Sequence, residues 1–209
     1  GIYVQELETG RRQLVSSHPG INGAPAWSPD GQRLAMTLSM GDSNLDIYVL
    51  NPATNELTRL TRNAAIDTEA SWAPDGKTIY FTSDRAGGPQ IYSVPSAGGT
   101  PKRVTFEGSY NARPRISPDE RSLAVVHNDR GNFRIALVDL ERRAVRILSE
   151  GRQDESPSFA PNGSMIIYAT RAGRRGVLAA VSTDGRVQQR IAATAGDVRE
   201  PVWSPYPVR

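Results

Sequence analysis

The chain has 209 residues, of which 38% are hydrophobic and 22% charged, and its 25 basic and 22 acidic residues give a net charge of +3. It has no cysteine, which excludes disulfides and thiolate metal sites, and no apolar run approaches the roughly 20 residues of a membrane-spanning helix. The arginines are scattered and interleaved with aspartate and glutamate, so we expect no nucleic-acid partner and no membrane insertion.

Residues 1–17 contain two short apolar segments, at 2–4 and 14–15, and then a repeat begins. An aromatic or branched residue is followed two positions later by proline five times, at intervals of 45, 44, 43 and 44 residues. These anchors are Trp27, Trp72, Ile116, Phe159 and Trp203. A period near 44 is typical of β-propeller blades, because one small sheet cannot bury both faces until its neighbours stack around an axis.

Each repeat predicts four antiparallel strands. The first ends at the anchor and is followed by a tight turn such as Pro29-Asp30-Gly31, in which proline sets φ and glycine tolerates a positive φ. Apolar positions then mark the other three strands. The second strands contain 34–36, 79–81, 123–125 and 166–168, the third Ile47, Ile91, Ile135 and Leu178, and the fourth Leu60, Val104, Leu148 and Ile191.

We therefore predict an all-β fold in which residues 1–209 form a single β-propeller domain of four-stranded antiparallel blades. Residues 1–17 match only the last two strands of a blade, and residues 202–209 match only the first. The chain is expected to begin and end within a blade and to hold about five blades' worth of sequence. The aromatic anchors are predicted to pack between adjacent blades, and Asp30, Asp75 and Asp119 to serve as turn residues.

The position three residues before each anchor differs from repeat to repeat, whereas its following neighbour is always proline or alanine. Because this column starts the innermost strand, we expect its side chains to line one mouth of a central channel. Together with the residues one step earlier they form a predicted mixed-charge rim, our candidate partner site. Its members are Gly23, Ala24, Thr68, Glu69, Ala112, Arg113, Glu155, Ser156, Arg199 and Glu200. The alternative is a solvated funnel in which no single residue matters.

Metal and cofactor sites are not indicated by any motif. Acidic residues near the predicted channel offer oxygen ligands for calcium, although no EF-hand spacing is present. These residues are Asp67, Glu69, Asp154, Glu155 and Glu200. We expect no cofactor, with a calcium ion in the channel as the alternative. His18 and His127 lie at unlike repeat positions and predict no ligand pair.

An ordered set of segments makes the repeat more specific. The set comprises 22–31, 68–69, 81–92, 161–163 with 167–168, 182–185 and the terminal Trp-Ser-Pro within 201–205. In this order they resemble the TolB family, periplasmic proteins of the Tol-Pal envelope system of Gram-negative bacteria. The family joins an amino-terminal α/β domain to a six-bladed propeller, so the resemblance implies the propeller without its first blade and part of its second.

The resemblance also implies a function. It implies a periplasmic, non-enzymatic module that binds the Pal lipoprotein through the mouth of the propeller and supports outer-membrane integrity and cell division. Contacts with other Tol proteins would use the missing amino-terminal part. The Pal-facing loops of the family match 21–24 and 68–69, which adds Ile21 and Asn22 to the site. Relatives often carry histidine where this chain has Ile21, so an apolar contact is expected there.

Enzyme motifs are absent from the sequence: it has no G-x-S-x-G elbow, no Walker loop, no H-E-x-x-H and no cysteine nucleophile. We therefore expect no catalytic activity. The main alternative is the gating propeller of a prolyl oligopeptidase-like serine peptidase, which would need a hydrolase segment beyond Arg209. A third reading is a lectin-like propeller, for which Tyr110 and Tyr206 are the stacking candidates.

Overall fold

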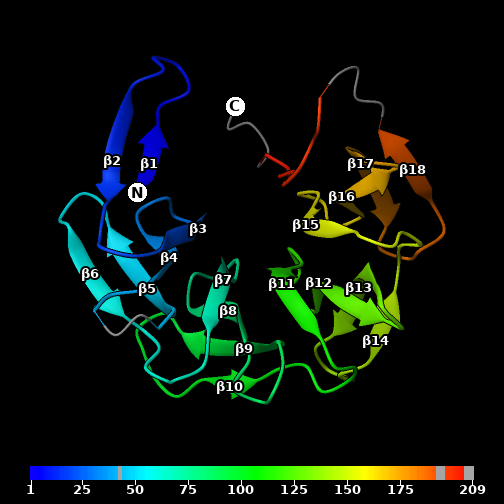
Figure 1. The fold of residues 1–209 in the computed structure, drawn as a ribbon, viewed down its shortest axis with the longest axis horizontal. Helices are drawn as coiled ribbons and strands as arrows, with labels where there is room; N and C mark the ends of the chain where they lie inside the picture. The colour runs from blue at the N-terminus through cyan, green and yellow to red at the C-terminus, as the bar shows by residue number, and fades with distance from the viewer. Residues whose placement is uncertain (42–43, 192–195, 205–209) are drawn as a thin grey trace. The chain divides into compact units, whose positions relative to one another are not determined.

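The computed structural model describes residues 1–41, 44–191 and 196–204, in which every regular element is a β-strand (Figure 1). The predicted all-β fold is confirmed. Tertiary contacts divide the chain into two compact units. Unit 1 comprises residues 1–88 and 92–102, and unit 2 comprises residues 89–91 and 103–209. No helix within the described ranges is long and apolar enough to cross a membrane.

Unit 1 begins with a two-stranded antiparallel sheet of β1 (Ile2–Gln5) and β2 (Arg12–Ser16). The next sheet runs in chain order through β3 (Asn22–Trp27), β4 (Leu34–Leu38), β5 (Asp46–Asn51) and β6 (Glu56–Arg59). A third sheet, most of which belongs to this unit, follows with β7 (Asp67–Trp72), β8 (Thr78–Ser83), β9 (Gln90–Pro95) and β10 (Lys102–Arg103).

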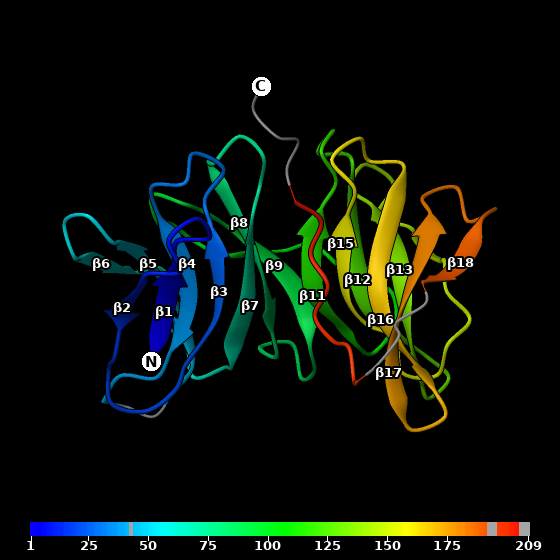
Figure 2. The same ribbon diagram turned by 90° about the horizontal axis from the view of Figure 1, so that it is seen from above.

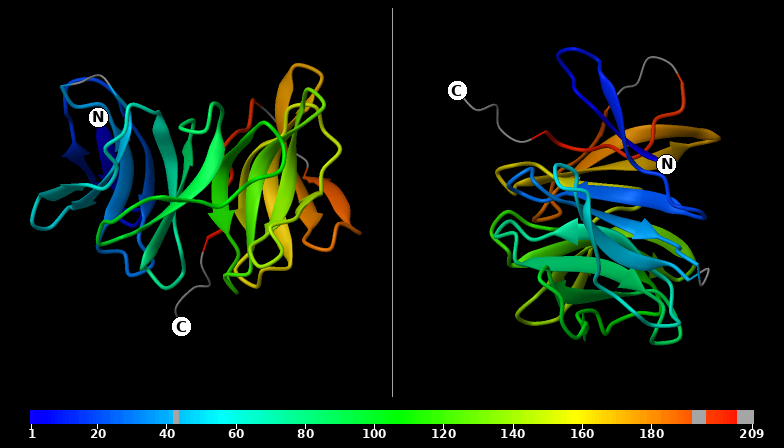
Figure 3. Two further views of the ribbon diagram at one scale, coloured as in Figure 1. Left: turned by 90° about the horizontal axis from the view of Figure 1, so that it is seen from below. Right: turned by 90° about the vertical axis from the view of Figure 1, so that its left-hand side faces the viewer.

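Unit 2 contains two four-stranded sheets of the same order (Figures 1 and 3). The first comprises β11 (Asn111–Ile116), β12 (Ser122–Asp129), β13 (Asn132–Asp139) and β14 (Val145–Ile147). The second comprises β15 (Glu155–Phe159), β16 (Met165–Ala172), β17 (Arg175–Ser182) and β18 (Gln188–Ile191). Four strands in each of these repeats and the pair of strands in residues 1–17 are thus confirmed, but Leu60, Val104 and Leu148 each lie one residue after the fourth strand rather than within it.

The cores lie between neighbouring sheets. In unit 1, Ile2 packs against the β3–β6 sheet, beside which β1 lies (Figure 2), and the opposite face of that sheet packs against the β7–β10 sheet. In unit 2, the β11–β14 and β15–β18 sheets bury a shared cluster that includes Ile135, Ile166 and Tyr168. Stacking is what makes each blade stable, because a single sheet buries too little apolar area on its own.

The anchors divide into buried and exposed ones. Trp72 is 6% exposed and its indole N–H donates to the carbonyl of Ala26 at 3.0 Å, and Phe159 packs at the edge of the unit 2 core. Trp27 and Trp203 are 46% and 39% exposed, so the prediction that all the aromatic anchors are core residues is wrong for these two. Trp27 follows a sheet of only two strands, which cannot cover it as the β3–β6 sheet covers Trp72.

Residues 201–204 form no strand, contrary to the prediction of a first strand there, and 205–209 lie outside the described residues. A strand requires a partner to complete its ladder of hydrogen bonds. The amide of Trp203 instead donates to the hydroxyl of Ser158 on β15 at 3.1 Å.

One repeated hydrogen-bond pattern was not predicted from the sequence. The hydroxyls of Thr61, Thr105 and Ser149 accept the amides of the third-strand residues Ile47, Ile91 and Ile135, at 2.8–2.9 Å. Each hydroxyl donates in turn to a buried carboxylate or amide oxygen, of Asp46, Gln90 or Asp154. The recurrence of a hydroxyl residue every 44 positions was the available sign.

Candidate partner-binding site

The column chosen from the sequence has an unusual backbone. Each first strand skips its register around the chosen position, between Gly23 and Ala26 in β3, Thr68 and Ser71 in β7, Ala112 and Arg115 in β11, and Glu155 and Ser158 in β15. Such a skip is a β-bulge, which re-aims the side chain that it carries. We call the five column residues the bulge residues, including Glu200, which lies outside any strand: Ala24, Glu69, Arg113, Ser156 and Glu200.

All five bulge residues have left-handed backbones. Their φ angles are 47°, 57°, 56°, 56° and 50° in chain order, a region that non-glycine residues occupy at a cost of about 1–3 kcal/mol each. The following proline at 25, 114 and 157 has no amide hydrogen, which suits a position skipped by the ladder. The constant neighbour and the strained residue are therefore two parts of one bulge.

Unit 2 brings four of the predicted site residues together. A terminal guanidinium nitrogen of Arg113 lies 3.9 Å from a carboxylate oxygen of Glu155 and 3.9 Å from one of Glu200, and it donates to the hydroxyl of Ser156. The side chains of Arg113, Glu155 and Glu200 are 32%, 40% and 76% exposed. They form a partly solvated charge cluster that joins residues from three successive repeats.

In unit 1 the predicted residues make smaller contacts. Glu69 is half-buried and accepts a hydrogen bond from the hydroxyl of Thr82 at 3.1 Å, and Thr37 donates to the hydroxyl of Thr68 at 3.2 Å. The side chain of Asn22 accepts the amide of His18 at 3.0 Å and donates to its carbonyl at 2.7 Å, which closes the loop before β3.

Exposure varies among the remaining predicted residues of both units. Ile21 is 55% exposed, Ala24 is exposed and Gly23 is half-buried. In unit 2, Ala112 is 2% exposed and therefore lies beneath the surface. Arg199 is exposed and pairs with Asp197 at 3.0 Å rather than with the Arg113 cluster.

The acidic residues considered for calcium have other contacts. Asp67 is fully buried and accepts two hydrogen bonds from Arg85, at 2.7 and 3.0 Å, and Asp154 accepts from Ser149 and from the amide of Gly151. Among the described residues, no group of three or more acidic, histidine or cysteine side chains is placed to hold a metal ion. The calcium ion stays a prediction that rests on the sequence alone.

The stacking candidates of the lectin reading differ in placement. Tyr110 makes an edge-to-face contact with Phe133, with 5.1 Å between the ring centroids, at the border of the unit 2 core. Tyr206 lies outside the described residues. The geometry of Tyr110 is that of a packing residue.

Comparison with known proteins identifies the repeat. Residues 1–207 match the sequence profile of the family described as TolB beta propeller domain. The chain belongs to this TolB family. The Tol-Pal system protein TolB of Xanthomonas oryzae pv. oryzae (strain PXO99A) is 55% identical over 115 residues, which are 54% of this chain and 26% of that protein. The expected family and the predicted propeller fold are both confirmed.

Solved structures of TolB proteins agree with this assignment. TolB from Acinetobacter baumannii matches with a TM-score of 0.90 and 47% identity over 97% of this chain and 51% of its own. A putative TolB from Agrobacterium tumefaciens matches with a TM-score of 0.84 and 25% identity over 96% of this chain and 72% of its own. The chain thus spans about half of the Acinetobacter TolB structure, and its 115 matched residues span about a quarter of the Xanthomonas protein.

Peptidase propellers share the fold alone. A puromycin hydrolase structure matches with a TM-score of 0.69 at 16% identity, over 89% of this chain and 31% of its own. At that identity the likeness carries no argument for peptidase function, whereas the TolB relatives match at up to 55%.

Proposed function

We propose that the chain is a non-enzymatic interaction module of the Tol-Pal cell-envelope system, works in the periplasm, and binds the Pal lipoprotein through its bulge residues. Outer-membrane integrity and cell division are the processes that this binding would support. The other Tol proteins would be contacted by parts of the full protein beyond this chain. The observation that carries the proposal is the charge cluster of Arg113, Glu155 and Glu200, in which Arg113 and Glu200 have left-handed backbones.

Two properties suit this cluster to protein binding. The bulge residues repeat one left-handed backbone conformation, on four bulged strands and at Glu200, under side chains of differing charge and size, so one scaffold presents a variable surface. At 3.9 Å, Arg113 also lies beyond normal hydrogen-bond distance of both glutamates. Charged groups of a partner can therefore replace these two long ion pairs while Arg113 keeps its hydrogen bond to Ser156.

The test is calorimetric titration of the complete chain with the globular domain of Pal. We expect Arg113→Ala and Glu69→Arg each to weaken binding by about 1–3 kcal/mol, roughly five- to 150-fold, since each removes or reverses a charge at the interface. The matched control is Arg142→Ala, which removes an exposed arginine paired with Asp139 in the turn after β13. This variant should bind Pal like the parent chain.

Three results would count against the proposal. Failure of the parent chain to bind Pal would reject Pal as the partner. Binding that is unchanged in both Arg113→Ala and Glu69→Arg would place the Pal site away from the bulge residues. An equal loss in Arg142→Ala would indicate a general charge effect. Circular dichroism of each variant separates lost binding from lost folding.

A further inference from the structure

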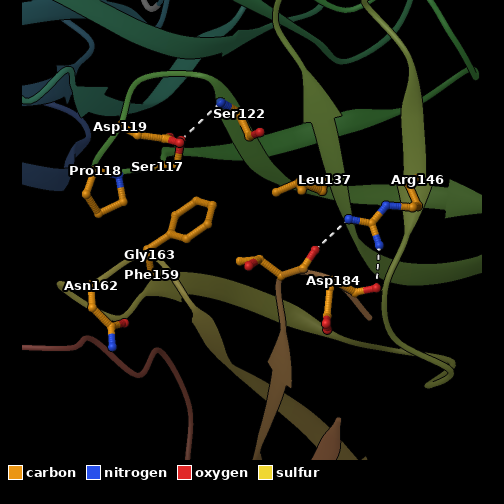
Figure 4. A pocket seen from close by; sticks show the side chains of 11 residues that line it. Ser117, Pro118, Asp119, Ser122, Leu137, Arg146, Phe159, Asn162, Gly163 and Asp184 are labelled. Atoms are coloured by element: carbon orange, nitrogen blue, oxygen red, sulfur yellow. Dashed lines mark hydrogen bonds between the residues drawn. The ribbon is translucent and has the colours of Figure 1, made fainter. Parts of the chain in front are cut away.

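A second candidate site lies at the opposite end of β15 from the bulge. A pocket of about 400 Å³ opens between the two sheets of unit 2, among the turns that follow β11, β15 and β17 (Figure 4). The ring of Phe159 lies at its centre, between Pro118 and Leu137 (Figure 4). Neither the predicted site nor the proposed Pal interaction uses these residues.

The repeat in unit 1 shows what fills the corresponding place there. Arg33, six residues after its anchor, holds its guanidinium carbon 4.8 Å from the ring centroid of Trp72, the anchor of the next blade. Its terminal nitrogen donates to the carbonyl of Gly76, four residues after Trp72, at 3.5 Å. An arginine side chain is therefore bound there by an aromatic face and a turn carbonyl.

Unit 2 keeps the aromatic ring and the turn glycine but has serine in place of the arginine. Phe159 stands at the repeat position of Trp72, and Gly163 at that of Gly76. Ser122 stands at the position of Arg33, and its short side chain cannot reach Phe159 as arginine reaches Trp72. Phe159, Gly163 and Ser122 all line the pocket, so the pocket coincides with the place that Arg33 fills in unit 1.

Two of the three charged side chains that line the pocket are carboxylates. Asp119 and Asp184 both line it, and hydrogen bonds from the hydroxyls of Ser117 and Ser182 lower their pKa values, so both are ionised at neutral pH. Arg146 lines it too, but its two terminal nitrogens donate to the carbonyls of Asp184 and Thr183, at 2.9 and 2.5 Å (Figure 4). These three lining side chains carry a net charge of −1, and the exposed Arg186 outside the lining pairs with Asp184 at 3.8 Å.

We propose that this pocket binds the guanidinium group of an arginine side chain that a protein partner presents. The guanidinium stacks on the ring of Phe159, as that of Arg33 stacks on Trp72, and donates to the carbonyl of Gly163. A protein partner is favoured over a free small cation because the matching place in unit 1 is filled by an arginine side chain of the polypeptide, Arg33, which lies in the turn just before β4. This site is separate from the bulge residues and does not rest on Pal binding.

The first experiment uses Nα-acetyl-arginine methylamide as the probe and follows amide chemical shifts of the complete chain by NMR. We expect saturable shifts at Phe159, Gly163 and Asp184. The citrulline analogue has nearly the same shape without the charge and should bind at least about tenfold more weakly. The lysine analogue should also bind more weakly, because an ammonium lacks the planar fork. Equal binding of the arginine and citrulline probes would overturn the proposal.

Two reciprocal variants test the site itself. Ser122→Arg restores the internal arginine, so it should compete with the probe and weaken binding at least about tenfold. Arg33→Ser should do the reverse and create a second site, with new shifts at Trp72 and Gly76. If Ser122→Arg binds the probe as tightly as the parent chain, the probe binds elsewhere and the proposal is wrong. Phe159→Leu keeps an apolar side chain and should also weaken binding, whereas unchanged binding would contradict the stacking.

Discussion

Truncation of Trp72 to alanine should destabilise the chain far more than the same change at Trp27. The two residues share a repeat position, but Trp72 is 6% exposed and Trp27 is 46% exposed. Removing a buried tryptophan costs about 3–5 kcal/mol. Loss of its hydrogen bond to Ala26 and of the stacked Arg33 guanidinium places Trp72→Ala towards the upper end of that range. Trp27→Ala should cost about 1 kcal/mol, because much of that side chain is already in water.

Thermal unfolding followed by far-UV circular dichroism measures the difference. For a domain of this size, each kcal/mol lowers the melting temperature by about 2–4 °C, so we expect a loss of about 6–20 °C for Trp72→Ala and about 2–4 °C for Trp27→Ala. Phenylalanine at position 72 keeps the apolar ring without the N–H donor and should fall between the two. Equal losses for Trp72→Ala and Trp27→Ala would refute the view that the neighbouring four-stranded sheet sets the burial of an anchor.

Two further predictions concern polar groups in unit 2. Thr105→Val removes the hydroxyl that links the amide of Ile91 to the side chain of Gln90, so urea denaturation should show a free energy of unfolding lower by about 1–3 kcal/mol. Thr105→Ser keeps the hydroxyl and should lower that free energy clearly less. His127 is buried against Asn111, and burial lowers its pKa below 6.5, so the unfolded chain binds the proton more tightly. Stability should therefore fall as the pH drops from about 7.5 towards 5, and His127→Gln should reduce that slope; an unchanged slope would exclude His127 as its source.

The candidate site was predictable in its positions but not in its contacts. The column of Ala24, Glu69, Arg113, Ser156 and Glu200 stood out because its neighbour hardly varies, and all five residues proved to share one backbone conformation. That the conformation is left-handed was not predictable, since residues of these types rarely adopt it and none of the five is glycine. The meeting of Arg113 with Glu155 and Glu200 depends on which sheets lie side by side.

The strands and turns of this chain are encoded by a local sequence pattern that recurs in every repeat. Each blade is predicted by an anchor, a proline-led turn and three apolar segments at constant spacing. Local patterns suffice here because each strand of a meander pairs with its neighbours along the chain. Whether Trp27 and Trp72 are covered, and whether Arg33 or a pocket beside Ser122 faces the next anchor, was decided by the tertiary structure. Those outcomes depend on side chains supplied by another sheet, about 40 residues away, which no single repeat contains.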